Sequence, residues 1–271
     1  MHFQQQYLYC QQPAKVIQEH LYQLIPRIME NIDNFVVQPI EAHTQTIIIL
    51  HGRDSVASEF AGELFESQAS DARTLPEIYP GFRWVFPNSS MLRSKRFDTE
   101  MSQWFDMWST EQPHDKEEMS RAGIEAAVAR MTDLVEQESK AVPLDHIFLG
   151  GISQGSAVGI HTLLRGELQI GGYMGFSTWL PFYDEVKHQT TTIKTPIFLA
   201  HNKDDEVISV ENGEQMRETL QHIGLEVTWR EYEEGGHWFN EPKGIDDVVA
   251  FLARCGVSSR NRSATASQST G

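Results

Sequence analysis

Ser153 lies in the pattern Gly-Ile-Ser-Gln-Gly (151–155), which can present a serine hydroxyl as a nucleophile. An apolar run at 146–149 precedes the pattern, and a segment with helical periodicity, 156–168, follows it. We therefore expect a strand, a sharp turn and a helix, with the serine at the apex of the turn. Glycines flank the serine because the strained turn leaves no room for neighbouring Cβ atoms. The first amides of the helix would point at a reacting carbonyl group.

Two further residues with suitable chemistry follow other predicted strands. Asp205 comes after the run 196–200, and His237 comes after the run 226–232. Active sites in parallel α/β sheets lie beyond the carboxyl ends of the strands, so both side chains are expected near Ser153. The histidine would take the serine proton and return it to the leaving group, while the aspartate would orient the imidazole and stabilise its cation.

Asp204 is adjacent to Asp205, so either carboxylate could orient the histidine. We favour Asp205 because Glu-Val-Ile (206–208) follows it, at the place where many hydrolases have an Asp-Pro-x-Val turn. In this interpretation the other carboxylate only caps the following segment.

Apolar runs that alternate with helical periodicity predict the elements that position these residues. Runs with strand character lie at 35–37, 46–50, 82–86, 146–149, 170–176, 196–200 and 226–232. Helical periodicity lies around Phe60, Leu64 and Phe65, at 118–135 after a possible capping box of Asp115 and Glu118, and at 156–168, 210–223 and 244–254. This alternation predicts an α/β fold with a mostly parallel, twisted sheet and helices on both faces.

The sequence divides into three parts. Residues 1–33 form an N-terminal extension, partly helical, that either packs on the body of the protein or acts as a cap over the site. Residues 34–255 form the α/β domain, and residues 256–271, rich in Ser, Thr, Gly and Asn, are expected to be a disordered tail. Within the domain, the Met-rich and aromatic stretch 89–113 is predicted to be a long irregular loop with a function.

Composition excludes several classes of protein. A formal net charge of -16 argues against nucleic-acid binding, which needs clustered Lys and Arg. The chain has no apolar run long enough for a membrane span and no secretory signal. The two cysteines, Cys10 and Cys255, offer no metal-binding spacing and no disulfide framework, so we predict no metal site and a cytoplasmic location. The oligomeric state cannot be predicted.

Seven blocks of sequence resemble the acyl-protein thioesterase/carboxylesterase family of α/β-hydrolases (phospholipase/carboxylesterase type), in the order in which that family has them. The blocks are Leu-His-Gly (50–52), Pro-Asn (87–88), Ser-Gln-Trp-Phe-Asp (102–106), Leu-Gly-Gly-Ile-Ser-Gln-Gly (149–155), Trp-Leu-Pro (179–181), Asp-Asp (204–205) and the segment from Tyr232 to His237. The resemblance covers roughly 35–254. It implies the α/β-hydrolase fold, no cofactor, and hydrolysis of esters or thioesters of a small-molecule or acylated-protein substrate.

The resemblance also implies an oxyanion hole made by the backbone N–H groups of Gln154 and Arg53. Here the chain departs from the family, which commonly reads His-Gly-Leu-Gly-Asp where this chain has His-Gly-Arg-Asp-Ser (51–55). The Arg53 side chain could recognise an acidic group on the substrate, or it could point to solvent or pair with Asp54. An apolar groove for an acyl chain could be lined by Met91, Leu92, Trp179 and Leu180.

Three functions remain open. The favoured one is a serine hydrolase that cleaves carboxylic esters or thioesters through a Ser-His-Asp triad and an acyl-enzyme. The second is an esterase or lactonase for a small specialised metabolite, which Arg53 and the basic residues of 93–96 would select. The third is a ligand-binding protein on a hydrolase fold without activity, against which the intact Ser153, Asp205 and His237 argue.

Overall fold

A seven-stranded sheet, in the order β1-β3-β2-β6-β7-β8-β9, forms the centre of the computed structural model, which describes residues 34–260. Its strands are β1 (Asn34–Val37), β2 (Gln45–Leu50), β3 (Phe82–Pro87), β6 (Ile147–Ile152), β7 (Gly172–Phe176), β8 (Ile197–Asn202) and β9 (Val227–Tyr232). Strand β1 is antiparallel to β3, and all other neighbouring pairs are parallel. The mostly parallel α/β sheet predicted from the alternation of strands and helices is confirmed. The predicted N-terminal extension lies outside the described residues.

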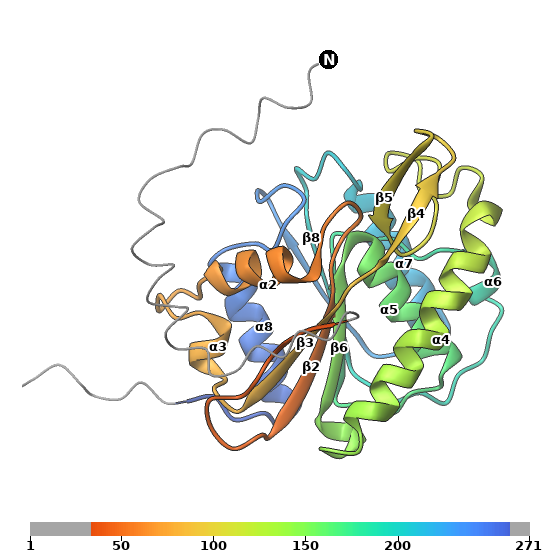
Figure 1. The fold of residues 1–271 in the computed structure, drawn as a ribbon. Helices are drawn as coiled ribbons and strands as arrows, with labels where there is room; N and C mark the ends of the chain where they lie inside the picture. Colours follow the sequence, from red (N-terminus) through yellow and green to blue (C-terminus); the bar gives the residue numbers. More distant parts are fainter. Residues whose placement is uncertain (1–33, 261–271) are drawn as a thin grey trace, which may run out of the picture.

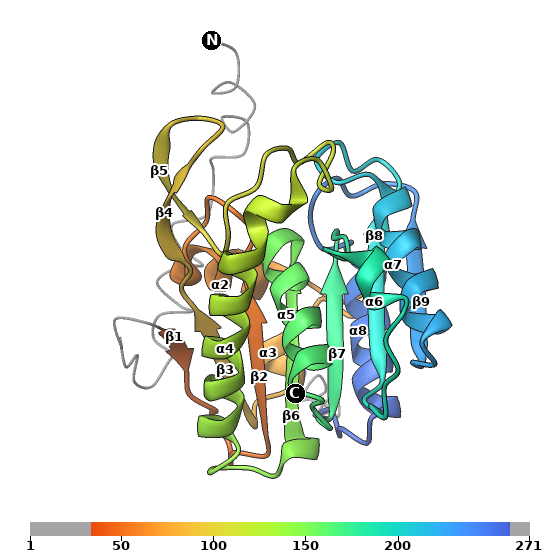
Figure 2. The ribbon, with the colours of Figure 1, turned by 90° about the vertical axis from the view of Figure 1, so that its right-hand side faces the viewer.

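Helices cover both faces of the sheet (Figure 1). One face carries α2 (Ala57–Glu66), α3 (Leu75–Ile78) and α8 (Lys243–Arg254), and the other carries α4 (Arg121–Glu138), α5 (Ser153–Arg165), α6 (Tyr183–Val186) and α7 (Val210–His222). The second group lies in front of the strands in Figure 2. Two short 3-10 helices, Glu117–Ser120 and Leu144–His146, precede α4 and β6.

Strand β2 shows why the strands of this sheet have continuous apolar sequences. Ile47 and Ile49 belong to the core that packs against α2, α3 and α8, whereas Ile48 and Leu50 belong to the core on the opposite face. Because both faces are covered, every residue of the run is buried, and the strand has no alternation of apolar and polar positions.

The segment after β3 differs from the prediction of an irregular loop. Strand β4 (Ser90–Ser94) pairs antiparallel with β5 (Thr99–Gln103) in a separate two-stranded hairpin, which projects beyond the end of the main sheet (Figure 1). Most of the hairpin residues are exposed or half-buried, so their sequence carries no regular apolar face. Without a buried face, the alternation that signals a strand is absent.

Two other expectations are corrected. Helix α4 begins at Arg121, after a 3-10 turn, and Asp115 and Glu118 do not form its capping box; Glu118 instead pairs with Arg121 at 2.7 Å. Two residues of the predicted tail contact the domain: Val257 is buried, and the amide of Arg260 donates to the Ile78 carbonyl at 2.9 Å. The rest of the predicted tail, 261–271, lies outside the described residues. Within 34–260, no helix has the length and apolar character needed to cross a lipid bilayer.

Candidate active site

Ser153 lies at the junction of β6 and α5, with its backbone in the left-handed region (φ 54°). This conformation is strained for a residue with a side chain and is typical of functional sites. A Cβ on Gly155 would lie 2.4 Å from the His51 carbonyl oxygen, and one on Gly151 would lie 2.8 Å from the Leu50 carbonyl oxygen. Both flanking glycines therefore allow the helix to approach β2 closely, as the Gly-x-Ser-x-Gly pattern predicts.

His237 and Asp205 form a hydrogen-bonded pair beside the end of β8. Nδ1 of His237 lies 2.8 Å from Oδ2 of Asp205, and the Asp205 side chain is fully buried. Oδ1 of Asp205 accepts hydrogen bonds from the amides of Val207 (2.9 Å) and Ile208 (3.0 Å). The carboxylate is thus fixed on both oxygens, and the imidazole presents Nε2 as an acceptor.

The ionisation of Asp205 follows from these contacts. Burial alone would raise the pKa of the carboxyl group, but hydrogen bonds from His201, His237 and the Ile208 amide outweigh it and hold the pKa below its usual value. Because Asp205 is therefore ionised near neutral pH, its partner nitrogen on His237 must carry the proton. This fixes the tautomer that a general base needs.

The neighbouring carboxylate, Asp204, has a different partner. Its two oxygens accept from the amides of Gly235 (3.1 Å) and Gly236 (2.8 Å), in the loop that carries His237. Asn202 holds the same loop from the other side, because its Nδ2 donates to the carbonyls of Gly236 and Trp238, both at 2.8 Å. The geometry separates the two acidic side chains: one contacts the imidazole and the other contacts the loop backbone.

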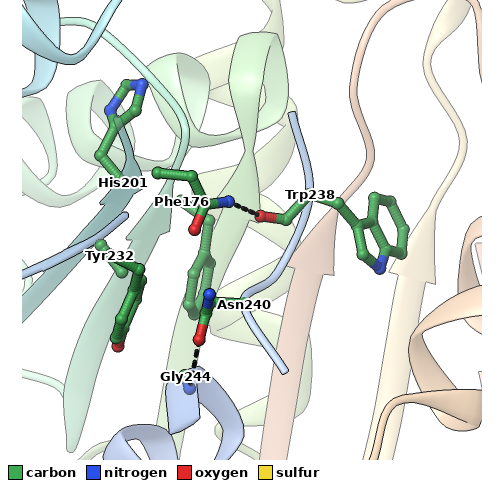
Figure 3. A pocket seen from close by; sticks show the side chains of 8 residues that line it. Phe176, His201, Tyr232, Trp238, Asn240 and Gly244 are labelled. Atoms are coloured by element: carbon green, nitrogen blue, oxygen red, sulfur yellow. Dashed lines mark hydrogen bonds between the residues drawn. The ribbon is translucent and has the colours of Figure 1, made fainter. Parts of the chain in front are cut away.

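A small cavity lies behind this loop (Figure 3). It has a volume of about 10 Å³ and is lined by Phe176, Ala200, His201, Asn202, Tyr232, Trp238, Asn240 and Gly244. In Figure 3, Asn240 points toward the start of α8, where its Oδ1 accepts from the Gly244 amide at 3.2 Å. The cavity has room for about one water molecule, so the loop that carries His237 rests on packed protein.

The Gln154 amide lies in the first turn of α5, where backbone N–H groups have no acceptor within the helix. Its side chain joins the elbow to the segment after the hairpin: Oε1 accepts from the Trp104 amide, and Nε2 donates to the Phe105 carbonyl, both at 2.8 Å. Gln154 is fully buried, so these bonds are shielded from water. The sequence did not reveal this link, because the two segments are far apart in the chain.

The loop 51–55 lies against Ser153. A Cβ on Gly52 would be 3.6 Å from the Cβ of Ser153, which places the following Arg53 amide at the edge of the site. The Asp54 amide donates to the Ser102 carbonyl at 2.7 Å, and this bond ties the loop to the end of the hairpin. The amides of Arg53 and Gln154 therefore belong to two segments that hydrogen-bond to the same region, 102–105.

His51 fixes the start of that loop, a role the sequence did not reveal. Its Nδ1 lies 2.7 Å from the Gly52 carbonyl oxygen, and its Nε2 accepts from the Ser89 amide at 3.1 Å. Burial lowers the pKa of His51 to about 4. The ring is therefore neutral at pH 7, with its proton on Nδ1, and it acts here as a structural link between two loops.

Ser153 and His237 line the same open pocket, which has a volume of about 980 Å³. Its apolar lining consists of Phe60, Phe97, Met101, Ile152, Val207 and Trp238. Its acidic lining consists of Asp54, Glu59, Glu63, Glu66 and Glu241. Burial, together with the charges of Glu59 and Glu66, raises the pKa of Glu63 above its usual value. The pocket thus combines apolar surface with an acidic wall along α2.

The residues proposed to line an acyl groove do not line this pocket. Trp179 and Leu180 are each 1% exposed and belong to the core on the α4 and α5 face, where Trp179 packs against Phe105. Met91 and Leu92 lie on β4, and Met91 is 63% exposed. The apolar character of these four residues could not show whether each lies in the core, at the pocket or on the surface.

Arg53 lines the pocket, and its side chain contacts the hairpin. Its Nε lies 3.1 Å from the Met101 sulfur, and its guanidinium lies 5.3 Å from the centre of the Phe97 ring. Burial lowers the pKa of the guanidinium, while the charges of Asp106 and Asp54 act in the opposite direction. Arg53 therefore packs the hairpin onto the rim of the pocket. Among residues 34–260 no three His, Cys, Asp or Glu side chains gather as metal ligands.

Comparisons with known proteins show the family to which the chain belongs. The family model described as Phospholipase/Carboxylesterase matches residues 31–255. Acyl-protein thioesterase 1 of Yarrowia lipolytica is 32% identical over 220 residues, which cover 78% of this chain and 92% of the relative. Acyl-protein thioesterase 1 of Aspergillus fumigatus is 30% identical over 235 residues, covering 81% and 91%.

Solved structures show the same fold. Arabidopsis thaliana SOBER1 superposes with a TM-score of 0.67 at 22% identity, covering 79% of this chain and 99% of that one. Zea mays acyl-protein thioesterase 2 superposes with a TM-score of 0.66 at 22% identity, covering 82% and 98%. The chain therefore belongs to the phospholipase/carboxylesterase family of α/β-hydrolases and is an ester or thioester hydrolase.

Proposed function

We propose that the chain hydrolyses acyl esters or thioesters through a triad of Ser153, His237 and Asp205 and a covalent acyl-enzyme. The observation that carries the proposal is the 2.8 Å hydrogen bond between His237 and Asp205, at a pocket that Ser153 also lines. The strained backbone of Ser153 supports it, because such strain persists where function requires it.

The reaction follows from the protonation states. Oγ of Ser153 attacks the carbonyl carbon of the substrate, and Nε2 of His237 takes the hydroxyl proton. The backbone N–H groups of Gln154 and Arg53 stabilise the oxyanion of the tetrahedral intermediate. When the carbon–oxygen or carbon–sulfur bond breaks, His237 gives the proton to the leaving alcohol or thiol. Water, activated by the same imidazole, then attacks the acyl-enzyme and releases the carboxylic acid and free Ser153.

The substrate we propose is an acyl ester or thioester of a small molecule or of an acylated protein; the names of the relatives point to acyl-protein thioesters, and the family description points to carboxylic esters. Apolar side chains around Ser153, such as Ile152, Val207 and Trp238, offer contact surface for an acyl group. The pocket is open, so a leaving group larger than a simple alcohol can remain outside it. A cytoplasmic location remains our proposal, supported by the low cysteine content of the sequence.

The alternative of an esterase or lactonase for a small specialised metabolite selected by Arg53 is less favoured, because Arg53 contacts Met101 and Phe97 and five carboxylates line the pocket. A labelling experiment tests the triad. A fluorophosphonate probe should label the wild-type protein and fail to label Ser153→Ala, with His237→Ala at least a hundredfold slower. A series of p-nitrophenyl esters, measured beside an S-acyl-cysteine peptide, then gives the acyl length and the preferred leaving group. Equal labelling of folded wild type and Ser153→Ala would contradict the assignment.

A further inference from the structure

A second histidine, which is buried, contacts the carboxylate that we assign to the triad. Nε2 of His201, near the end of β8, lies 3.3 Å from Oδ2 of Asp205, and the two side chains are 1% and 0% exposed. The same oxygen receives Nδ1 of His237 at 2.8 Å. One carboxylate oxygen thus lies between two imidazoles, one facing the pocket and one enclosed in the protein.

The surroundings of His201 fix its tautomer. Nε2 also lies 2.8 Å from the Ile208 carbonyl oxygen, so both neighbours of this nitrogen are acceptors. A carbonyl has no proton to give and Asp205 is ionised, so Nε2 must carry the proton and share it between them. Nδ1 faces α7, where a Cβ on Gly213 would come within 2.5 Å of it. Figure 3 shows His201 on the far side of the small cavity from the indole ring of Trp238.

The polar and charged groups around His201 and Asp205 come from three parts of the fold. Asp205 receives His201 from β8, His237 from the loop after β9, and the amides of Val207 and Ile208 from its own turn. Glu211 on α7 interacts electrostatically with His201. Asp204, although adjacent in sequence, binds the loop amides instead.

We propose that His201 is a positioning residue of the triad, which holds Asp205 in the orientation that His237 needs. This inference rests on the proposed function. Its Nε2–H bond opposes rotation of the carboxylate and disperses the negative charge of the oxygen that faces His237. Without this donor, that oxygen would carry more charge and stabilise the imidazolium form of His237 more strongly.

Two substitutions of similar size test the proposal. Gln at position 201 can place an N–H near the position of Nε2, whereas Leu fills similar space and has no donor. We expect His201→Gln to keep kcat within about threefold of the wild type. We expect His201→Leu to lose about ten- to a hundredfold in kcat with KM unchanged, the range for a hydrogen bond to a charged group. The acid limb of its kcat/KM profile should also move to higher pH.

Three results would overturn the proposal. One is a wild-type kcat and pH profile in folded His201→Leu. Another is an equal loss in both variants with an unchanged pH profile, which would mean that His201 only fills space. The third needs no variant: ¹⁵N shifts of the wild-type protein that place the His201 proton on Nδ1. Asp205→Asn separates this question from the proposed function, because wild-type activity in that variant would remove Asp205 from the triad, whatever His201 does.

Discussion

The side chain of Asn202 occupies the space that a Cβ on Gly235 would need: its Cγ, Nδ2 and Oδ1 would each lie 2.7 Å away. Asn202 also donates from Nδ2 to the two carbonyls that flank His237 in sequence. The asparagine and the glycine therefore depend on each other.

Gly235→Ala should damage both stability and activity. The new Cβ meets Asn202, and the backbone at this position has φ 146°, which residues with side chains rarely adopt. We expect a loss of about 1–3 kcal/mol in the free energy of unfolding and about a hundredfold in kcat. Urea unfolding and ester kinetics measure the two effects.

The matched control is the double variant Asn202→Gly, Gly235→Ala. It removes the steric conflict but keeps the backbone strain, and it loses the two hydrogen bonds of Asn202, so its stability loss should be smaller than the sum of the two single losses. If the double variant were as unstable as the sum of the two single changes, the contact between these residues would not be the cause.

The two adjacent acidic residues should respond differently to the same substitution. Asp205→Asn removes the charge that fixes the His237 tautomer, so we expect kcat to fall about 10³- to 10⁴-fold. Asp204→Asn keeps one acceptor oxygen for the amides of Gly235 and Gly236, so we expect a loss of about tenfold or less. Steady-state kinetics on one ester decide the matter. A larger effect at Asp204 would reverse the assignment of the triad acid.

The buried His161 should make the protein less stable in mild acid. Burial lowers its pKa from 6.5 to about 4, and its Nε2 lies 2.9 Å from the Pro181 carbonyl oxygen. Between pH 6.5 and 4 the unfolded chain binds a proton that the folded protein does not, so the free energy of unfolding falls as pH decreases. For this residue the loss is roughly 2 kcal/mol at pH 5 relative to pH 7.

His161→Gln keeps an N–H for the carbonyl and removes the titration. Urea unfolding at pH 7 and pH 5 should show a smaller difference in this variant than in the wild type. His51, whose pKa burial also lowers to about 4, leaves a second part of the dependence in place. An unchanged difference in the variant would show that His161 does not titrate as its burial indicates.

The acidic wall on α2 should discriminate between substrates by charge. Glu59, Glu63 and Glu66 line the pocket at spacings that put them on one face of the helix. We expect Glu63→Gln to raise kcat/KM for an anionic ester about two- to fivefold relative to a neutral ester at low salt, with the effect lost at high salt. Glu136→Gln, on α4 outside the pocket lining, is the control. It should leave the ratio of kcat/KM for the anionic ester to that for the neutral ester unchanged at low and at high salt. Equal ratios in both variants would exclude a role for the wall.

The main sheet and the elbow could be predicted from the sequence because they rest on local rules. Strand β2 is buried on both faces and so reads as a continuous apolar run, and the turn at Ser153 requires glycines at fixed positions. The sequence alone leaves the choice between Asp205 and Asp204 a hypothesis. The spacing of the turn favoured it, and the structure places only Asp205 against His237.

Other features depend on contacts between distant segments and could not be predicted. The hairpin of β4 and β5 has no buried face, so its sequence shows no alternation. Trp179 and Met91 are both apolar, yet one is in the core and the other on the surface, because residue type alone does not choose between the two. The bonds of Gln154 to Trp104 and Phe105 join residues about fifty positions apart, and no local pattern reports them.

Some residues of the hairpin segment line the pocket, and others hydrogen-bond to the loops around Ser153. The two groups should therefore respond differently to substitution. Phe97 and Met101 line the rim of the pocket, while Ser102 and Trp104, which follow, hydrogen-bond to the loop 51–55 and to Gln154. We therefore expect a library randomised near the tip, away from the Arg53 contacts, to change substrate choice with less effect on the proposed catalytic groups. Changes only a few residues further along would cost turnover with every substrate.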